Sequence, residues 1–270
     1  MYKRQVLNNI RAKYNLDESL PMQYALYMKD LMMFDLGPSI TSETRTVNSI
    51  IADGLPASAQ LGIQALIISL IFGLILGIIA ALYHNRIIDY AAMLIAILGI
   101  SVPSFILAPL LIKYFSVEWG ILPVASWGTW QHSVLPTIAL AMGPLAIIAR
   151  FMRASMLEVM NQNYIRTANA KGLSTVRLVI NHGIRNAILP VVTFIGPLFV
   201  NLITGTFVIE KIFAIPGLGK YFVDSIFNRD YPVILGTTIF FSAILVVTLF
   251  LIDISYRLID PRIKLTSGGK

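Results

Sequence analysis

The sequence predicts an all-α membrane protein, a polytopic bundle of transmembrane helices, and three observations support this class. Hydrophobic residues make up 56% of the 270-residue chain, and charged residues only 13%. Soluble domains carry about 25% charged residues, so this composition lies far on the apolar side. The mean hydropathy is +0.74. The chain also contains long stretches without any charged residue. Because a helix needs about 20 apolar residues to cross a bilayer, these stretches are long enough to span it.

Five spans are expected, each built around a stretch without Lys, Arg, Asp or Glu. They lie near 60–83, 90–113, 134–156, 187–210 and 233–256. Their apolar runs are continuous, whereas a strand of a membrane barrel alternates over about 10 residues, so these spans are helices. In the first span, Gly73 and Gly77 form a small-xxx-small face that predicts close helix packing. The chain therefore divides into an extracytoplasmic N-terminal segment (1–57), a transmembrane domain (58–264) and a short tail (265–270).

Basic residues set the expected orientation of the bundle. The segment 150–186, which covers the end of the third span and the loop after it, carries Arg150, Arg153, Arg166, Lys171, Arg177 and Arg185. The loop 114–133 has no Lys or Arg and holds the three tryptophans, as an outer interfacial belt does. Because positively charged loops stay in the cytoplasm, the loop 157–186 and the C-terminal tail are expected inside and residues 1–57 outside.

The predicted outer segment contains no signal peptide and no apolar run that could carry it across the membrane. We therefore expect that an N-terminal span is missing from the chain, with unaided translocation as the alternative. Within this segment, residues 21–31 place apolar side chains at roughly helical spacing. This pattern predicts a small outer subdomain lying on the membrane face, and a mobile tail is the alternative.

Composition and motifs argue against several function classes. The chain has no cysteine, which excludes disulfides and thiolate metal sites. His84, His132 and His182 lie in loops or at span ends and form no catalytic or metal-binding pattern, which argues against a membrane enzyme. No Gly-x-x-x-x-Gly-Lys-Ser/Thr phosphate loop is present. The span centres lack ionisable residues, which argues against a proton relay. The net charge of +7 is interpreted as cytoplasmic-loop bias rather than as nucleic-acid binding.

Prolines and a few polar residues mark a candidate path through the bundle. The second span contains Ser101, Pro103 and Ser104, and later spans also contain prolines, which kink helices by removing a backbone hydrogen bond. In the fourth span, polarity is confined to Asn201, Thr204, Thr206 and Glu210. These residues either line a solute path, or Asn201 bonds a neighbouring helix while Glu210 sits at the membrane surface.

The segment between the third and fourth spans is too patterned for a simple linker. Asn163 is placed to cap a short helix, Gly172 fits the C′ position after it, and Ser174 is placed to cap a second helix over 175–181. Small residues on the first helix allow another protein to approach its backbone, and the basic ones can meet acidic groups. We predict a docking surface for a soluble partner, with a solvated loop as the alternative. Its residues are Tyr164, Arg166, Thr167, Ala168, Ala170, Lys171 and Gly172.

Several motifs resemble those of a known family. The run Arg166-Thr-Ala-Asn-Ala-Lys-Gly172 is similar to the peptide-transporter form of the Glu-Ala-Ala…Gly loop of ABC importer permeases. Arg166 stands where the family at large has Glu, and Arg is the peptide-subgroup form. The other matches are Asp35-Leu-Gly37, Leu55-Pro56-Ala57, Ser101-Val-Pro103, Arg185-Asn-Ala-Ile-Leu-Pro190, Ile215-Pro-Gly-Leu-Gly219, Arg229-Asp-Tyr-Pro232 and Asp260-Pro261. Together they resemble the first of the two permease subunits of oligopeptide/dipeptide importers.

This resemblance implies a fold and a set of partners. The fold would be that of a type I ABC importer permease with six spans, the first lying before residue 15. The loop 157–186 would hold the coupling helix that docks on a cytoplasmic ATPase, and ATP with Mg²⁺ would bind only in partner subunits. The partners would be a second homologous permease, two ATPases, an extracytoplasmic peptide-binding protein and a peptide, in a bacterial or archaeal cytoplasmic membrane.

The implied activity is ATP-driven import of oligopeptides or dipeptides by alternating access. Relatives with similar motifs carry nickel and other small solutes, so such a solute is the alternative substrate, and an ion-driven carrier is a more distant alternative. The loop 211–232 would meet the binding protein through Gly217, Gly219, Lys220 and Asp224. The path would use Ser101, Pro103, Ser104, Asn201, Thr204 and Thr206.

Overall fold

The computed structural model describes residues 11, 14–42, 44–204 and 207–259. Within these ranges the chain is helical, with one isolated β-bridge between Pro38 and Thr46 and no strand. Two segments, Ile112–Glu118 and Val179–Ile184, are π-helical. The α-helices are α2 (Leu20–Met32), α3 (Val47–Leu82), α4 (Ile87–Ser101), α5 (Ser104–Leu111), α6 (Trp130–Met160), α7 (Asn163–Ala170), α8 (Thr175–Leu178), α9 (Arg185–Ala187), α10 (Leu189–Thr204), α11 (Phe207–Ile212), α12 (Leu218–Phe227) and α13 (Tyr231–Ile259).

The predicted class, a helical membrane bundle, is confirmed. Three helices, α3, α6 and α13, are long and apolar enough to cross a membrane alone. Two bent pairs pass the same test together, so the described residues hold up to 5 spans if each pair counts as one. The first pair covers the second predicted span, whereas the second pair only overlaps the fourth, because its first half, Thr175–Ala187, lies almost entirely before that predicted span. This second pair is bent by 49° between α9 and α10.

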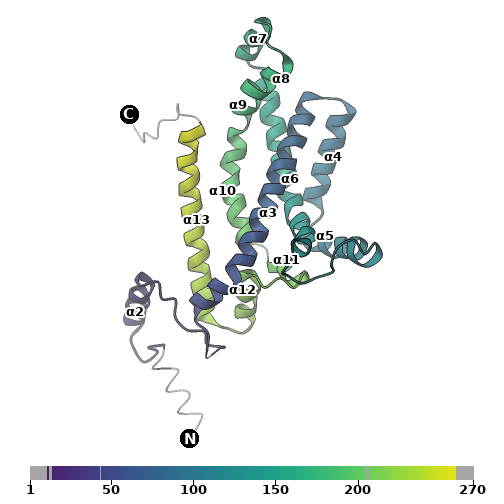
Figure 1. Cartoon of the computed structure of the whole chain (residues 1–270). Helices are drawn as coiled ribbons and strands as arrows, with labels where there is room; N and C mark the ends of the chain where they lie inside the picture. Colours follow the sequence, from purple (N-terminus) through teal and green to yellow (C-terminus); the bar gives the residue numbers. More distant parts are fainter. Residues whose placement is uncertain (1–10, 12–13, 43, 205–206, 260–270) are drawn as a thin grey trace, which may run out of the picture.

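The second predicted span does not cross the bundle as one helix. Its two halves meet at 101° around Val102 and Pro103. Pro103 has no N–H to donate, and the residue before a proline is held extended, as the φ of −92° and ψ of 111° at Val102 show. The sequence predicted a kink here but not a bend of this size. As a result, α5 runs at a steep angle to α4 (Figure 1).

The first span begins earlier than predicted. Helix α3 starts at Val47, where Thr46 and Ser49 form a capping box in which each side chain accepts a hydrogen bond from the other's backbone N–H. The expected boundary between residues 57 and 58 therefore lies inside a continuous helix. The helix continues through Pro56, its tenth residue, although proline cannot donate a hydrogen bond to the carbonyl of Ala52.

The core of the bundle forms where α3 packs lengthwise against α6. The close packing predicted for Gly73 and Gly77 is confirmed. A Cβ atom on Gly73 would lie 2.9 Å from the carbonyl oxygen of Leu145, and one on Gly77 would lie 2.6 Å from that of Ala149. Glycine therefore sets how closely the two helices approach. Fully buried side chains fill the adjoining space, among them Leu61, Leu135, Ile148, Met152 and Met156.

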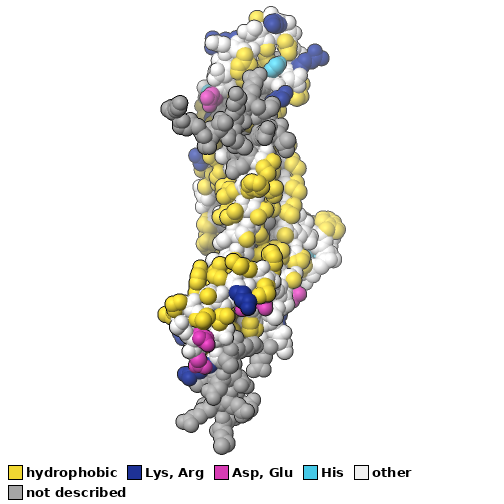
Figure 2. All heavy atoms as spheres, turned by 90° about the vertical axis from the view of Figure 1, so that its left-hand side faces the viewer, with side chains coloured by type: hydrophobic (Ala, Val, Ile, Leu, Met, Phe, Trp, Pro, Cys, Tyr) yellow, Lys and Arg dark blue, Asp and Glu magenta, His cyan; other side chains and the backbone are white. Residues whose placement is uncertain are grey.

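The bundle has two distinct ends. The α3–α4 turn and helices α7 to α9 lie at one end, which we call the α7 end (Figure 1). Helices α5, α11, α12 and α2 lie toward the opposite end, which we call the α12 end. Figure 2 shows a broad hydrophobic band between the two ends on the face that carries α13, with charged side chains gathered toward the ends. This distribution matches that of a chain that crosses a bilayer.

A buried carboxylate clasps the N-terminal segment at the α12 end. Asp230, 1% exposed, lies just before α13 and accepts hydrogen bonds from the backbone N–H groups of Ile40 at 3.1 Å and Thr41 at 3.2 Å. The hydroxyl of Thr41 donates to it at 2.7 Å, and the hydroxyl of Ser39 also donates to it. Burial raises the pKa of Asp230, but these donors outweigh it and hold the pKa below its usual value. By contrast, α2 itself buries no residue.

We predict that Gly77→Ala destabilises the bundle. The added Cβ would meet the backbone of α6, which cannot move aside without separating the helices, so we expect a loss of about 1–3 kcal/mol in the free energy of unfolding. Thermal unfolding of the purified protein in detergent measures this loss. Gly143→Ala is the matched control, because a Cβ there meets no atom within 4 Å. Equal stability of both variants would contradict the packing role of Gly77.

We predict that the clasp at Asp230 opens in acid. Because its pKa is lowered on folding, its contribution to stability is complete above the ordinary aspartate value of about 3.9 and is lost as the pH falls through the lowered pKa. The protection factors of the amides at residues 39–41, taken against the intrinsic exchange rate at each pH, should therefore fall below about pH 4. Asp230→Asn should show low protection factors at these amides across the whole pH range. A pH profile that is the same in both proteins would contradict the clasp.

Candidate functional site

A cavity of about 510 Å³ lies where α4, α6 and α10 meet. Three prolines from different elements line it: Pro103 at the α4–α5 bend, Pro144 in α6 and Pro197 in α10. A proline cannot donate a backbone hydrogen bond, so a helix bends most easily at or beside it. These three flexible points therefore surround the same cavity. We call this space the central cavity. It is the candidate path through the bundle.

Two of the polar residues predicted for the path line the central cavity. They are Ser104 at the start of α5 and Asn201 on α10. The side chain of Asn201 is exposed and makes no hydrogen bond to another described residue, so the inter-helix bond considered from the sequence is not formed there. Ser101 ends α4 but does not line the cavity. Thr204 is the last residue of α10, but the structure does not describe its side chain. Thr206 lies outside the described residues.

Glu210 has an environment that neither sequence interpretation anticipated. Its side chain is fully buried in α11, where it accepts hydrogen bonds from the hydroxyl of Ser58 at 2.6 Å and from the N–H of Lys220 at 3.2 Å. The same hydroxyl of Ser58 accepts from the N–H of Leu218 at 2.8 Å. Glu210 is therefore enclosed by the protein and does not line the central cavity. It joins α3, α11 and α12 at the α12 end.

The two glycines before α12 are buried against α11 and not presented to a partner. A Cβ atom on Gly217 would lie 2.3 Å from the carboxylate of Glu210, and one on Gly219 would lie 2.8 Å from the backbone of Phe207. The partner contact predicted for Gly217 and Gly219 is therefore corrected, because close packing onto Glu210 requires glycine at both places. Of the other residues predicted for this contact, Lys220 is exposed and Asp224 is half-buried.

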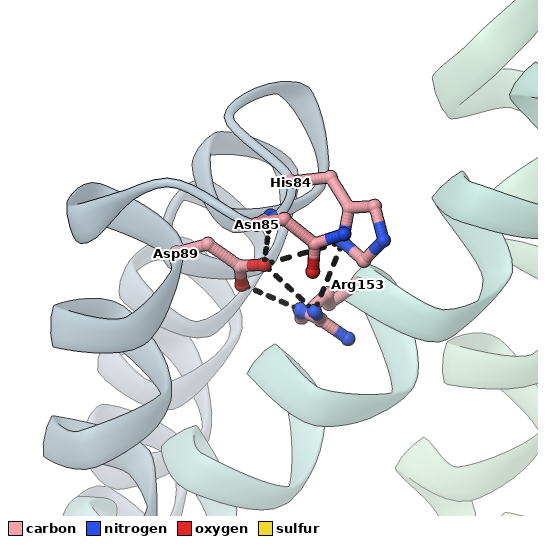
Figure 3. A network of polar contacts seen from close by, with 4 residues as sticks. All are labelled: His84, Asn85, Asp89 and Arg153. Atoms are coloured by element: carbon pink, nitrogen blue, oxygen red, sulfur yellow. Dashed lines mark hydrogen bonds and ion pairs between the residues drawn. The ribbon is translucent and has the colours of Figure 1, made fainter.

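At the α7 end, an ion pair ties the α3–α4 turn to α6 (Figure 3). Asp89 is 1% exposed and binds Arg153 in a bidentate pair, with Nε to Oδ1 at 2.6 Å and Nη2 to Oδ2 at 2.7 Å. The N–H of Asn85 also donates to Asp89, at 3.0 Å. Bidentate geometry holds the two groups in one orientation, so the turn and α6 are held together as a unit.

His84 completes this cluster, which we call the Asp89–Arg153 lock. Its Nδ1 lies 3.2 Å from Nη2 of Arg153 and 3.3 Å from Oδ2 of Asp89. Arginine only donates hydrogen bonds, so the first contact needs an unprotonated Nδ1, while the second needs a protonated one. The two contacts therefore exclude each other, and the Asp89–Arg153 pair carries the attachment in either tautomer.

The predicted docking segment is a helical hairpin, α7 followed by α8. Gly172 has a φ of +82°, as its predicted C′ position requires. Its N–H bonds the carbonyl of Asn169 at 2.9 Å, and the next N–H, of Leu173, bonds that of Ala168 at 3.4 Å, which is a Schellman motif. The expected cap at Asn163 is wrong: Gln162 holds the cap position without a side-chain bond. Ser174 does precede α8, which gives way to the π-helical segment after Leu178.

The hairpin projects beyond the bundle at the α7 end (Figure 1). It is anchored by Ile165 and Leu178, each 4% exposed, and by a 3.2 Å hydrogen bond from Asn186 to the hydroxyl of Tyr164. Tyr164 and Val176 on the hairpin are exposed, as is Ile180 just after it in the π-helical segment. All residues predicted for docking are exposed except Ala168, which is half-buried: Tyr164, Arg166, Thr167, Ala170, Lys171 and Gly172.

Sequence reasoning missed the partners in both polar clusters. Asp89 and Arg153 were counted only as charges that bound the spans, and Ser58 was not singled out. A carboxylate at the start of the second predicted span together with an arginine near the end of the third was an available signal, since buried charges are paired. No sequence feature places Ser58 against Glu210, because their contact depends on how α3 meets α11.

The chain is similar in sequence to known transport proteins. Residues 73–265 match the family model "Binding-protein-dependent transport system inner membrane component". The dipeptide transport system permease protein DppB of Bacillus subtilis is 55% identical over 264 residues, which are 98% of this chain and 86% of that protein. The oligopeptide transport system permease protein OppB of Haemophilus influenzae is 43% identical, with 97% of this chain and 87% of that protein covered.

Solved structures share the fold at low sequence identity. A chain of the inward-facing MetNI methionine ABC transporter matches with a TM-score of 0.67 and 17% identity, covering 81% of this chain and 99% of that one. A chain of an amino acid ABC transporter with histidines matches with a TM-score of 0.61 and 17% identity, covering 78% of this chain and 94% of that one.

We predict that Arg153→Met destabilises the protein by about 3 kcal/mol, because it leaves the buried Asp89 without its counter-charge. The double variant Asp89→Asn with Arg153→Met should recover much of that loss, because no unpaired charge remains. A double-mutant cycle of unfolding in detergent measures the coupling. Lys113→Met is the control, since its pair with Glu118 is exposed and long, at 3.7 Å. Additive losses at Asp89 and Arg153 would contradict the lock.

Proposed function

The chain belongs to the family of binding-protein-dependent transport system inner membrane components, and on that basis we propose that it forms part of the path of a peptide importer. It is a multi-pass membrane permease of the ABC importer type and not itself an enzyme. In such systems, separate subunits hydrolyse ATP and a binding protein delivers the solute. The chain therefore contributes the path and the conformational change.

The peptide assignment rests mainly on one observation, the match to dipeptide and oligopeptide permeases over almost the whole chain. The central cavity is a suitable physical counterpart. Its volume of about 510 Å³ is within the range of ligand-binding pockets, roughly 300–1,000 Å³. Ser104 and Asn201 supply neutral hydrogen-bonding groups on a largely apolar wall. Such groups suit a peptide backbone whose side chains vary.

Alternating access would use the prolines around the central cavity. ATP binding closes the partner ATPases, the hairpin α7–α8 moves with them, and α6 carries this motion toward Pro144. The Asp89–Arg153 lock makes the α3–α4 turn follow α6 at the same end. The cavity opens outward to receive the peptide, and hydrolysis returns it inward. Each ligand shifts the equilibrium through its different affinity for the two states.

The hairpin α7–α8 is the proposed coupling site for a cytoplasmic ATPase. Its exposed apolar side chains would fill a cleft on the partner, and Arg166 and Lys171 would meet acidic groups around it. This assigns the loop 157–186 and the C-terminal tail to the cytoplasm of a bacterial or archaeal cell, and residues 1–57 to the outside. At the outer end, Lys220 and Asp224 are the proposed contacts with the peptide-binding protein.

The complete importer would contain a second, homologous permease and two ATPases. The large exposed hydrophobic surface of α4, with Ile87, Tyr90 and Leu94 exposed, would face that permease or lipid. Proteoliposomes holding the complete complex would test peptide import directly. Uptake of a labelled dipeptide that requires ATP and the binding protein supports it. Uptake driven by an ion gradient without ATP would support the secondary-carrier alternative, and uptake of nickel but of no peptide would support the small-solute alternative.

We predict that Gly172→Trp abolishes uptake while the protein still inserts in the membrane. Tryptophan at positive φ costs roughly 1–2 kcal/mol, and its bulk would also block close approach of the ATPase. Transport assays, with co-purification of the ATPase, measure both effects. Gly172→Asn should retain most of the activity, because asparagine tolerates this conformation.

Gly120→Trp is the matched control for this prediction. Gly120 also has positive φ, +62°, and a Cβ there also meets no atom within 4 Å, but it lies outside the hairpin. We expect this variant to keep its uptake and its ATPase. Wild-type uptake by Gly172→Trp, or equal loss in the two tryptophan variants, would sink the docking assignment.

A further inference from the structure

A second groove lies beside the central cavity, between α4 and α6 toward the α7 end. Its volume is about 510 Å³. We call it the Arg150 groove, and its lining residues are Met93, Ile147, Arg150, Phe151, Arg153 and Ala154. Apart from the two arginines, this lining is apolar. The side chain of Arg150 is exposed, so its guanidinium is accessible to a ligand in this groove.

The Arg150 groove continues the central cavity along one face of α6. Both spaces are lined by Ile147. The central cavity uses Leu140, Gly143 and Pro144 from α6, and the Arg150 groove uses residues from 147 onward. These positions follow each other at intervals of three or four residues, as one helix face requires. A solute moving along α6 from the central cavity toward the α7 end would therefore enter the Arg150 groove.

The two arginines of the groove differ in their electrostatic state. The charge of Arg153 is compensated by the bidentate pair with Asp89, so this side chain is held in place (Figure 3). Arg150 makes no ion pair or hydrogen bond to any side chain within the described ranges. Arg150 therefore supplies the uncompensated positive charge of the groove.

The depth of Arg150 places this charge at the inner end of the path. It lies roughly 30 Å along α6 from Trp130, about one hydrocarbon thickness at 1.5 Å per residue. A peptide that has passed the central cavity would reach Arg150 last. The position also satisfies the positive-inside rule, which explains a basic residue at this depth but not its place in a groove next to the path.

We propose that Arg150 binds the C-terminal carboxylate of the transported peptide at the inner end of the path, an inference that rests on the proposed peptide-importer function. The carboxylate is the anion that linear peptides share whatever their side chains. A guanidinium offers donors in a planar fork that matches it. The apolar lining, with Met93 and Phe151, receives the C-terminal side chain.

An anionic lipid headgroup is the competing ligand for an arginine at this depth. Lipid-binding pockets on the cytoplasmic side are typically built from clusters of basic residues. Among the described residues that line this groove, Arg150 alone is an unpaired cation, and the groove borders the central cavity at Ile147. These two observations favour the peptide over the lipid.

The test uses the complete importer in proteoliposomes, with ATP, and two labelled peptides: trialanine and its C-terminal amide. Both are supplied at concentrations that saturate the same binding protein. Arg150→Gln should lower uptake of trialanine about tenfold relative to the wild type and leave uptake of the amide unchanged. Arg150→Lys should lose less, because it keeps the charge without the fork. Arg86→Gln, a change in the exposed α3–α4 turn outside the groove, should alter neither rate.

Several outcomes would overturn this inference. Equal losses for both peptides in Arg150→Gln would show a structural role. Dependence of wild-type uptake on anionic lipid that disappears in Arg150→Gln would assign the groove to a headgroup. Unchanged trialanine uptake would show that Arg150 does not contact the peptide. If the wild type transports no peptide, the proposed function itself fails, which is a distinct result from transport that is indifferent to Arg150.

Discussion

The close contact between α3 and α6 is the constraint on which the rest of the structure depends. Gly73 and Gly77 bring the helix backbones so near that a single Cβ would collide with the carbonyl groups opposite. In a bilayer, lipid tails are as apolar as leucine side chains, so such packing is a main source of helix association. With this pair in place, α6 presents one face to the central cavity and the Arg150 groove. Its end carries the hairpin α7–α8, so packing, path and docking surface share one helix.

Buried polar groups stabilise the two ends of the bundle and leave its middle free to bend. At the α7 end, the Asp89–Arg153 lock joins the α3–α4 turn to α6. At the α12 end, Glu210 joins three helices and Asp230 clasps the N-terminal segment. These groups are held by several donors each, because an unsatisfied buried charge would destabilise the fold. Between the ends, Pro103 separates α4 from α5, while Pro144 and Pro197 lie inside α6 and α10, all around one cavity. A permease needs rigid ends and a flexible middle, because movement of one end changes the path only if the helices between the ends can bend.

Gly217 and Gly219 show that a sequence motif does not by itself indicate a surface for a partner. The pattern around Gly217 and Gly219 was interpreted as a contact with a partner, but both glycines pack on Glu210. The same run leaves Lys220 exposed one residue later. A glycine that allows close approach looks the same in sequence whether the approaching group belongs to another protein or to the same chain. Only the position of α11 distinguishes the two cases.

Much of this protein could be predicted from its sequence because lipid imposes a simple rule on composition. Apolar stretches predicted the positions of the long helices, and basic residues predicted the α7 end. The position of Gly172 after a short helix predicted its positive φ. Each of these signals is local in the sequence. The 101° bend at Pro103 exceeded the predicted kink, and the pairings of Asp89 with Arg153 and of Ser58 with Glu210 were not foreseen. Nor could the sequence place Pro103, Pro144 and Pro197 around one space. These features depend on contacts between residues far apart in the chain, so helix packing decides them and no single stretch of sequence contains them.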